Sequence, residues 1–232
     1  FARLLTHAAR HSPYYRSQPW AGRLLSGRKV RLHDIPVTGK STVRDHTALF
    51  YCDEVPSSEG ATMDKWTTGA TGEPILIKKT ARHFEFNAAE NTRLKAGWGF
   101  AQQTGYVKRS EPDSEHQEGT VKSLRSLGMK NGWKIYTVDP RRVIDLLDRS
   151  KSSQLAVYPS AAISILERRP PLPHLRLIST VGEVVTDELK ALLQLYPHCA
   201  HFDIYGSTET GVIAAKCSRC GNHHFASEHL LV

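Results

Sequence analysis

Long apolar runs are absent from this chain of 232 residues. No stretch approaches the roughly 20 consecutive apolar residues that a membrane-spanning helix needs, so we expect no membrane partner. Internal repeats and low-complexity tracts are also missing, and no signal peptide is visible. The hydrophobic content of 40% and the mean hydropathy of −0.40 are typical of a globular protein with one substantial core or two small ones.

Cysteine is scarce. The chain has four cysteines, and nothing in the sequence argues for the oxidising compartment in which disulfides form. We therefore expect a cytoplasmic protein with reduced thiols. Cys199 lies among apolar residues, which predicts a core position rather than a reactive thiol.

Acidic residues are outnumbered: 31 Lys and Arg stand against 23 Asp and Glu, for a formal net charge of +8. A basic surface can attract nucleic acid or anionic lipid. The basic residues are scattered, however, and form no stripe interleaved with aromatic residues. We therefore expect no nucleic-acid partner, and a solvated surface with some attraction for the phosphates of small ligands.

One segment is rich in glycine and threonine: Thr67-Thr68-Gly69-Ala70-Thr71-Gly72-Glu73-Pro74. Glycine lets backbone N–H groups turn toward an anion, and threonine hydroxyls donate to phosphate oxygens. The segment matches neither Gly-x-x-x-x-Gly-Lys-Ser/Thr nor Gly-x-Gly-x-x-Gly. It is consistent with a loop that wraps a polyphosphate, and the alternative is an ordinary turn.

A second segment of similar character lies far downstream, at Asp203-Ile204-Tyr205-Gly206-Ser207-Thr208-Glu209-Thr210-Gly211. The tyrosine ring can stack on a base, the hydroxyls can reach a phosphate, and the Glu209 carboxylate can bind Mg²⁺ through oxygen. The alternative is a strand followed by a turn, with a tyrosine that only packs.

The apolar patterning predicts helices that alternate with strands. The expected helices span residues 2–15, 39–48, 83–98, 141–149, 161–168 and 186–195, the last capped by Thr186. The expected strands span residues 75–77, 133–138, 155–158, 175–179, 201–205 and 212–215, and the polar residues 102–119 are expected to form a loop. This alternation predicts an α/β fold of layered, largely parallel sheets with flanking helices. Ligands then bind at the carboxyl ends of the strands.

Several motifs, in order, resemble one branch of the adenylate-forming (ANL) superfamily, the phenylacetate–CoA ligase-like and capsule-biosynthesis proteins. The resemblance rests on the two segments above and on five further ones: Ala8-Ala9-Arg10-His11-Ser12-Pro13-Tyr14-Tyr15-Arg16, Ile35-Pro36-Val37-Thr38-Gly39-Lys40, Tyr158-Pro159-Ser160-Ala161, Gly182-Glu183, and His224-Phe225-Ala226-Ser227-Glu228-His229-Leu230-Leu231-Val232. It implies an AMP-binding N-terminal lobe, with a helical region at residues 1–60 and a nucleotide-binding core at residues 61–232. In that family a smaller C-terminal lobe follows and carries a ribose-binding Asp and a catalytic Lys. We therefore expect this chain to be part of a longer protein and to be inactive alone.

The resemblance also implies an activity: ATP-dependent conversion of a small, possibly aryl, carboxylic acid to an acyl-adenylate, followed by transfer to CoA. ATP or AMP, Mg²⁺ and CoA are then ligands, and a homodimer is left open. Three alternatives remain: an adenylate-forming enzyme with a non-CoA acceptor, a non-catalytic nucleotide-binding lobe, and a zinc-binding module.

The same resemblance assigns a role to each candidate residue. Thr208 and Glu209 are the catalytic candidates, with Thr208 at the α-phosphate and Glu209 on Mg²⁺. The glycine- and threonine-rich residues Thr67, Thr68, Gly69, Ala70, Thr71 and Gly72 are expected at the phosphates. Gly182, Glu183 and Val184 are expected on one side of adenine, and Ile204 and Tyr205 on the other. Asp203, Gly206 and Ser207 are further nucleotide-binding candidates. The residues expected to face the carboxylic acid are Tyr158, Ser160 and Ala161.

Cys217, Cys220 and His224 form a separate cluster near the end of the chain. Cys-x-x-Cys followed closely by His is a spacing seen in zinc sites. In the resembling family, a Cys and a His at this place are completed by a later Cys-x-Cys-Gly. Cys217 and His224 then correspond to the family's ligands, and Cys220 is an additional candidate. The alternative is a reduced turn without metal.

Overall fold

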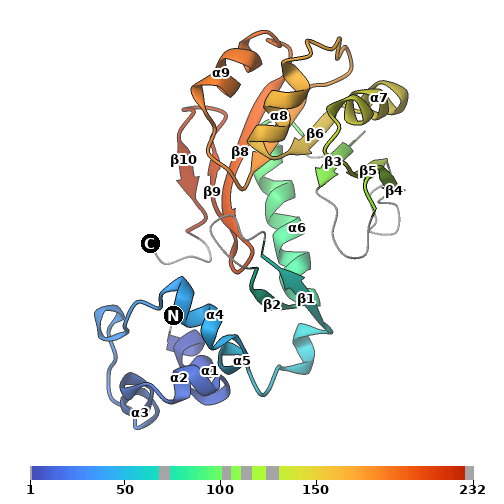
Figure 1. The fold of residues 1–232 in the computed structure, drawn as a ribbon. Coiled ribbons are helices and arrows are strands. Elements are labelled where there is room, and N and C mark those ends of the chain that lie inside the picture. The colour runs from blue at the N-terminus through green and yellow to red at the C-terminus, as the bar shows by residue number, and fades with distance from the viewer. Residues whose placement is uncertain (1, 68–73, 101–105, 111–116, 124–130, 228–232) are drawn as a thin grey trace. The chain divides into compact units, whose positions relative to one another are not determined.

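A computed structural model describes residues 2–67, 74–100, 106–110, 117–123 and 131–227 (Figure 1). They divide into two units, one that ends at Phe86 and one that begins at Asn87. The boundary falls within helix α6 (Ala81–Ala96). Each unit is described by itself.

The first unit begins with short helices around a small core of Ala9, Trp20 and Ala21. Its elements before the first strand are α1 (Ala2–His11), α2 (Pro13–Arg16), α3 (Pro19–Leu25), η1 (Leu32–Asp34), α4 (Lys40–Asp45), α5 (Thr47–Phe50) and η2 (Ser57–Glu59). The single helix expected over residues 2–15 is wrong, because Ser12 adopts an extended conformation before Pro13. A residue before proline is pushed out of the helical region, so the chain breaks there and a new helix starts at the proline.

An antiparallel hairpin follows in the first unit. Strands β1 (Thr62–Trp66) and β2 (Leu76–Thr80) pair from Thr62 opposite Thr80 to Trp66 opposite Leu76. The sequence predicted β2 approximately and missed β1, because all five residues of β1 are exposed and lack the alternation that marks a half-buried strand. In the sequence, the glycine- and threonine-rich segment lies between β1 and β2.

The second unit is built on a sheet in which, among the described residues, eight strands follow the order β10-β9-β8-β7-β6-β3-β5-β4. Their bounds are β3 (Tyr106–Ser110), β4 (Thr120–Ser123), β5 (Gly132–Tyr136), β6 (Gln154–Val157), β7 (Leu177–Val181), β8 (Ala200–Ser207), β9 (Gly211–Lys216) and β10 (His223–Phe225). The five strands from β8 to β5 are parallel, whereas β4, β9 and β10 join antiparallel at the edges. The expected largely parallel α/β sheet is confirmed.

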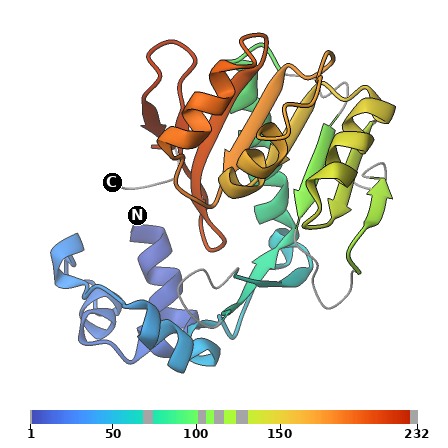
Figure 2. The same ribbon diagram turned by 45° about the horizontal axis from the view of Figure 1, so that its top comes forward.

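Helices cover both faces of this sheet (Figures 1 and 2). Ile178 faces a core shared with α7 (Pro140–Ser150), α8 (Pro159–Leu166) and α9 (Asp187–Gln194). Its neighbour Leu177 faces the opposite core, where Phe202 packs with Leu94 and Trp98. Successive residues of a strand point to opposite faces, so one buried strand supports both layers.

Strand β3 corrects an expectation from the sequence. Residues 102–119 were expected to form a loop, yet β3 lies inside the sheet between β6 and β5. The side chain of Val107 is fully buried, and Arg109 is only 9% exposed. The hydrophobicity pattern did not predict this strand, because it contains the basic residues Lys108 and Arg109. Long basic side chains can bury their aliphatic stems in a sheet while the charged group stays solvated or paired.

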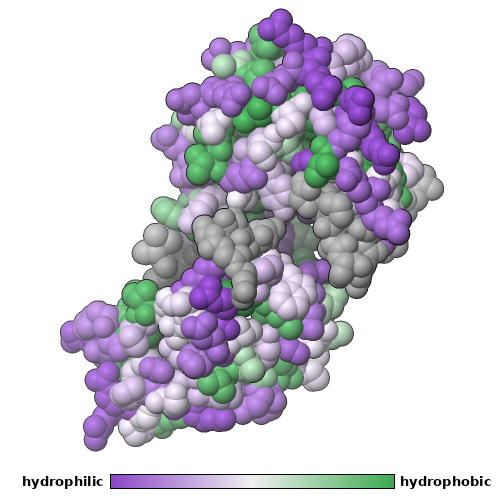
Figure 3. Space-filling model, viewed as in Figure 1, coloured by the Kyte–Doolittle hydropathy of each residue, from purple (hydrophilic) through white to green (hydrophobic). Residues whose placement is uncertain are grey.

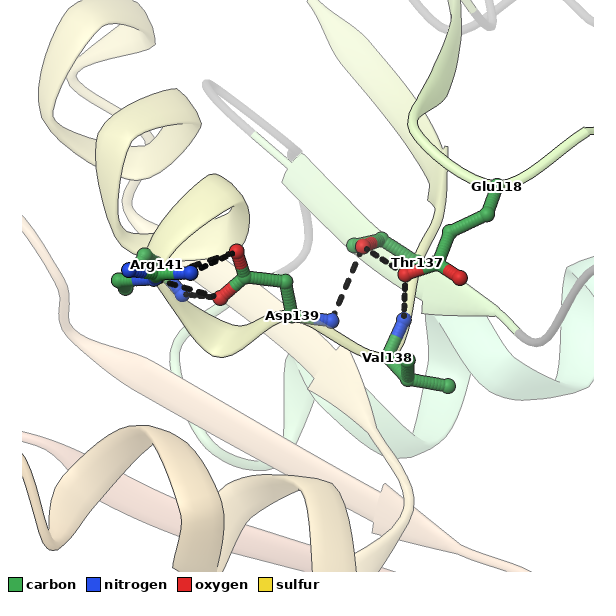
Figure 4. Close-up of polar contacts among 5 residues, drawn as sticks. All are labelled: Glu118, Thr137, Val138, Asp139 and Arg141. Atoms are coloured by element: carbon green, nitrogen blue, oxygen red, sulfur yellow. Dashed lines mark hydrogen bonds and ion pairs between the residues drawn. The ribbon is translucent and has the colours of Figure 1, made fainter.

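Polar contacts fix the start of α7 (Figure 4). The Asp139 carboxylate accepts a hydrogen bond from the backbone N–H of Arg141 at 2.9 Å and pairs with the Arg141 guanidinium at 3.0 Å. The backbone N–H of Asp139 donates to the Thr137 hydroxyl, which in turn donates to Glu118 at 3.2 Å. Asp139 thus caps the helix at its first turn, where Pro140 needs no N–H partner.

We expect Asp139→Ala to lower the midpoint of thermal unfolding by about 2–4 °C, because the first turn of α7 loses its cap. The matched control is Asp148→Ala on the same helix, where the carboxylate is exposed. Differential scanning calorimetry of both variants tests the role. Equal midpoints for the two variants would show that the cap adds nothing to stability.

Candidate functional site

A pocket of about 750 Å³ opens on the second unit at the end of β7 and over strands β8, β9 and β10. Its lining residues are Gly182, Glu183, Val184, Val185, Lys190, His201, Asp203, Ile204, Tyr205, Gly206, Ala214, Lys216, Gly221, His223 and Phe225. All residues expected beside adenine are in this set, and so are the further nucleotide-binding candidates Asp203 and Gly206, whereas Ser207 is not. The structure therefore brings together two segments, Gly182–Val184 and Asp203–Gly206, that lie about 20 residues apart in the sequence.

Strand register explains which side chains reach the pocket. His201, Asp203 and Tyr205 alternate along β8 and share one face. Thr180 of β7 lies directly opposite Asp203, and Phe225 of β10 lies opposite Ala214, which itself lies opposite Tyr205. Side chains at opposed positions point to the same face of a sheet. Pairing between β7, β8, β9 and β10 therefore brings these side chains together on the face that carries the pocket.

A hydrogen-bond network holds the Asp203 carboxylate. The Thr180 hydroxyl donates to Oδ1 of Asp203, and Nε2 of His223 contacts Oδ2 at 2.9 Å. Nε2 of His201 lies 2.9 Å from the same Thr180 hydroxyl. That hydroxyl has one proton, which it gives to the carboxylate, so it accepts the Nε2 proton of His201. Thr180, His201 and His223 were not assigned to the site from the sequence, since only strand pairing brings them to Asp203.

The pKa of His201 is lowered from 6.5 to about 4, chiefly by burial and then by the nearby positive charge of Lys216. The Asp203 carboxylate opposes this shift, while His223 adds a small lowering effect on the same pKa. The imidazole is therefore neutral at neutral pH, which agrees with its role as a single Nε2–H donor to Thr180.

This shift predicts a pH dependence of stability. The unfolded chain binds a proton at His201 below pH 6.5, whereas the folded protein does so only near pH 4. The unfolded state holds more protons in that window, so the contribution of His201 is present above pH 6.5 and is lost as the pH falls toward 4. We expect His201→Gln, which keeps an N–H donor, to flatten the pH dependence of the free energy of unfolding by up to about 1.4 kcal/mol per pH unit.

Urea unfolding at several pH values between 4.5 and 7.5 measures this slope. The control is His174→Ala, which removes an exposed histidine from the same unit. The interpretation fails if His201→Gln and His174→Ala have the same slope between pH 6.5 and 4.5.

Glu183 links the pocket rim to helix α8. Its carboxylate accepts hydrogen bonds from the backbone N–H of Ser160 at 2.8 Å and from the Ser160 hydroxyl at 3.0 Å. Gly182 has a φ of +88°, and a Cβ there would approach the Tyr158 ring to 3.0 Å. Ala161 is more buried than Tyr158 and Ser160: it packs in the hydrophobic core and is only 2% exposed. Tyr158, Ser160 and Ala161 do not line the 750 Å³ pocket.

A tight turn joins β8 to β9 beyond the pocket. Ser207 lies opposite Gly211, and the Ser207 side-chain oxygen accepts a hydrogen bond from the N–H of Thr210 at 3.1 Å. Gly211 has a φ of +82°, which suits a glycine that closes a three-residue hairpin loop. Thr208 is half-buried and Glu209 is exposed at the tip. An exposed carboxylate beside hydroxyls is a donor set that fits Mg²⁺, which binds proteins through few carboxylates together with phosphates.

The glycine- and threonine-rich segment belongs to the first unit. Thr67 is described: its backbone N–H donates to the Ile75 carbonyl at 3.0 Å, and its hydroxyl accepts from the Ile75 N–H at 2.9 Å. Both contacts close the hairpin at the base of the segment. The remaining residues assigned there, Thr68, Gly69, Ala70, Thr71 and Gly72, lie outside the described residues.

Cys217, Cys220 and His224 converge at the turn between β9 and β10. Their ligand atoms lie within 4.8 Å of one another, and Nε2 of His224 is 3.2 Å from Sγ of Cys220. Backbone N–H groups of Cys220 and Arg219 lower the pKa of Cys217, which favours the thiolate that binds metals. Tetrahedral zinc places such ligand atoms about 3.5–3.8 Å apart, so the three residues fit zinc after a small inward movement.

Cys199 behaves differently from this cluster. Its thiol donates to the Leu175 carbonyl at 3.3 Å, and burial raises its pKa to about 11. Cys199 packs against the main core, as expected from the sequence. Its thiolate is scarce at neutral pH, so it is not a reactive thiol.

Comparison with known proteins gives matches to solved structures. No protein-family model and no curated protein sequence matches the chain. A 2-hydroxyisobutyryl-CoA ligase with 2-HIB-AMP and CoA in the thioesterification state matches with a TM-score of 0.67 and 20% identity, over 95% of this chain and 50% of that chain. An open conformation of that ligase matches with a TM-score of 0.66 and 18% identity, over 95% of this chain and 52% of that chain.

The chain therefore shares the fold of part of these CoA ligase structures, a mixed α/β fold with a largely parallel sheet and flanking helices. The chain spans about half the length of the CoA ligase structures it matches. Within the part of the chain that the structure describes, no helix is long and apolar enough to cross a bilayer. On the face seen in Figure 3, hydrophilic and apolar residues are interspersed on both units.

Proposed function

We propose that this chain is the AMP-binding lobe of an enzyme that activates a small carboxylic acid with ATP and passes the acyl group to CoA. The observation that carries the proposal is the 750 Å³ pocket around Asp203 and Tyr205, continuous along β8 with the turn that bears Thr208 and Glu209. Support comes from the fold, since the structural neighbours are CoA ligases in complex with 2-HIB-AMP and CoA.

The chemistry explains why such a pocket is needed. A carboxylate is a poor electrophile, because oxide would have to leave. Its attack on the α-phosphorus of ATP forms an acyl-adenylate and releases pyrophosphate, after which AMP leaves readily when the thiol of CoA attacks. The protein must hold the two reactants in line and stabilise the charge on the phosphates.

The candidate residues have the following roles in this reaction. The exposed Tyr205 ring packs on one side of adenine, and Gly182 to Val184 line the other. The Thr208 hydroxyl would donate to the α-phosphate, and Glu209 would hold Mg²⁺. Bound there, Mg²⁺ would offset the negative charge on the phosphates. Thr67 to Gly72 are proposed to donate to the outer phosphates.

The acid itself is proposed to lie beside Tyr158 and Ser160, with Ala161 packing behind them. A tyrosine ring offers a flat apolar surface to an aryl group, which favours an aryl acid of the phenylacetate type. Ser160 and Glu183 are already hydrogen-bonded at the start of α8, so they hold this edge of the pocket in place.

The test is ATP–pyrophosphate exchange by the full-length protein with a panel of small aryl and aliphatic acids. We expect exchange with at least one acid, and a higher midpoint of thermal unfolding with AMP or Mg·ATP. CoA-dependent thioester formation then separates transfer to CoA from transfer to another acceptor. No exchange with any acid, together with no binding of ATP or AMP at millimolar concentration, would reject the proposal.

A further inference from the structure

Strand β10 carries two sites on its two faces. His223 and Phe225 line the 750 Å³ pocket, whereas His224 between them reaches Cys220 and Cys217. This follows from the alternation of side chains along a strand, which sends neighbouring residues to opposite sides. We call the turn between β9 and β10, which carries Cys217 and Cys220, the cysteine turn. The pocket and the cysteine turn therefore share one three-residue strand.

Few packing contacts hold β10 in place. All three of its residues are exposed, and the Phe225 side chain is 54% exposed. The strand is at the edge of the sheet and pairs only with β9 among the described strands. Segments with little buried apolar surface open at a low free-energy cost, so β10 depends on its flanking contacts for a defined position.

Hydrogen bonds flank β10 on both sides, at the turn that carries the cysteines and at Ala226, whose N–H donates to the Ile213 carbonyl at 2.9 Å. The N–H of Cys217 donates to the Asn222 carbonyl at 2.8 Å, and the N–H of Gly221 donates back to the Cys217 carbonyl at 3.0 Å. The side chain of His224 then meets Cys220 on the same turn. A cation bound by Cys217, Cys220 and His224 would connect the cysteine turn to the middle of β10.

Across the sheet, β10 reaches the carboxylate of Asp203 in the nucleotide pocket through His223. Nε2 of His223 lies 2.9 Å from Oδ2 of Asp203, while Thr180 holds Oδ1. Asp203 is 9% exposed and faces the pocket, so the direction of its remaining lone pairs depends on both partners. A displaced β10 would release one of the two carboxylate oxygens.

We propose that His223 is a positioning residue that couples a divalent-cation site at Cys217, Cys220 and His224 to the nucleotide pocket. Ligation by His224 orders β10, β10 places His223 on Asp203, and Asp203 then presents a fixed acceptor to the base. The inference rests on the proposed nucleotide site and adds its regulation by metal occupancy. Thermodynamic linkage requires the coupling to be reciprocal: zinc tightens AMP binding by the same factor by which AMP tightens zinc binding.

The experiment measures all four binding constants with the full-length protein. Calorimetry gives the Kd of AMP for the metal-stripped and the zinc-loaded protein, and a competing zinc indicator gives the Kd of Zn²⁺ with and without saturating AMP. We expect each ligand to tighten the other by about fivefold or more, with equal factors. Amide hydrogen exchange at residues 223–225 should slow when zinc binds.

Three variants identify the residue that transmits the effect. His223→Ala keeps all three metal-binding side chains, so we expect stoichiometric zinc but equal AMP affinity with and without the metal. His223→Gln retains an N–H donor and should recover part of the coupling. The control His174→Ala removes an exposed histidine elsewhere in the unit and should leave the coupling unchanged.

The outcomes are distinguishable. AMP binding that is identical with and without zinc in the wild-type protein overturns the coupling and leaves the proposed function standing. Coupling that persists in His223→Ala overturns the role of His223. A wild-type protein that binds no zinc also overturns the inference, and one that binds no AMP rejects the proposed nucleotide site with it.

Discussion

We expect Glu209→Gln to lower ATP–pyrophosphate exchange on the order of a hundredfold, the scale of losing one key electrostatic contact at a reacting centre. The amide keeps the size and shape of the side chain but removes the negative charge that we propose binds Mg²⁺. Glu209 is exposed at the tip of the β8–β9 turn, so the fold should be unaffected. Exchange kinetics under saturating acid, with circular dichroism as a check on folding, measure the effect.

The matched control is Glu188→Gln, which neutralises an exposed carboxylate on α9 of the same unit and should exchange at the wild-type rate. Raising the Mg²⁺ concentration should restore part of the activity of Glu209→Gln if the loss is one of metal affinity. Unchanged exchange in Glu209→Gln would show that this carboxylate is not the metal ligand.

Gly206→Ala is the second variant with a large expected effect. A Cβ at this position would lie 2.5 Å from the Gly211 carbonyl oxygen, a backbone atom that cannot rotate away. The register between β8 and β9 already shifts between Tyr205 and Gly206, so the turn must move to relieve the clash. A displacement of about 1 Å can cost on the order of a hundredfold in rate, and we expect a loss of that scale in exchange.

Gly22→Ala is the glycine control, since a Cβ there meets nothing within 4 Å and the residue lies in helix α3. It should exchange normally and be equally stable or slightly more stable. Thermal unfolding of both variants separates a displaced turn from a lost fold. Wild-type exchange in Gly206→Ala would mean that the position of the turn does not control the reaction.

Local sequence signals predicted the helices of the second unit well. Pro140 starts α7, and Thr186 caps α9 through a hydrogen bond from the N–H of Leu189 at 3.3 Å. Caps and prolines act within one turn of the chain, so their effect can be predicted without knowledge of the fold. The alternation of helices with strands likewise predicted a largely parallel sheet, which the strand pairings confirm.

Strands that depend on distant partners were predicted poorly. The polar β3 becomes an interior strand because β6 and β5 supply its hydrogen bonds on both sides. The exposed β10 was not expected at all, since its three residues form a strand only by pairing with β9. Strand propensity follows the neighbours more than the residue itself, and neighbours are set by tertiary structure.

The candidate site shows the same division. The sequence by itself determined which residue types are available: the hydroxyls and carboxylate of Thr208 and Glu209, and the Cys-x-x-Cys spacing at Cys217. Only the tertiary structure decided that Thr180 and His223 meet at the two oxygens of Asp203. Chemical character is a property of each residue, whereas convergence depends on strand register, and register is set by pairing between segments far apart in the chain.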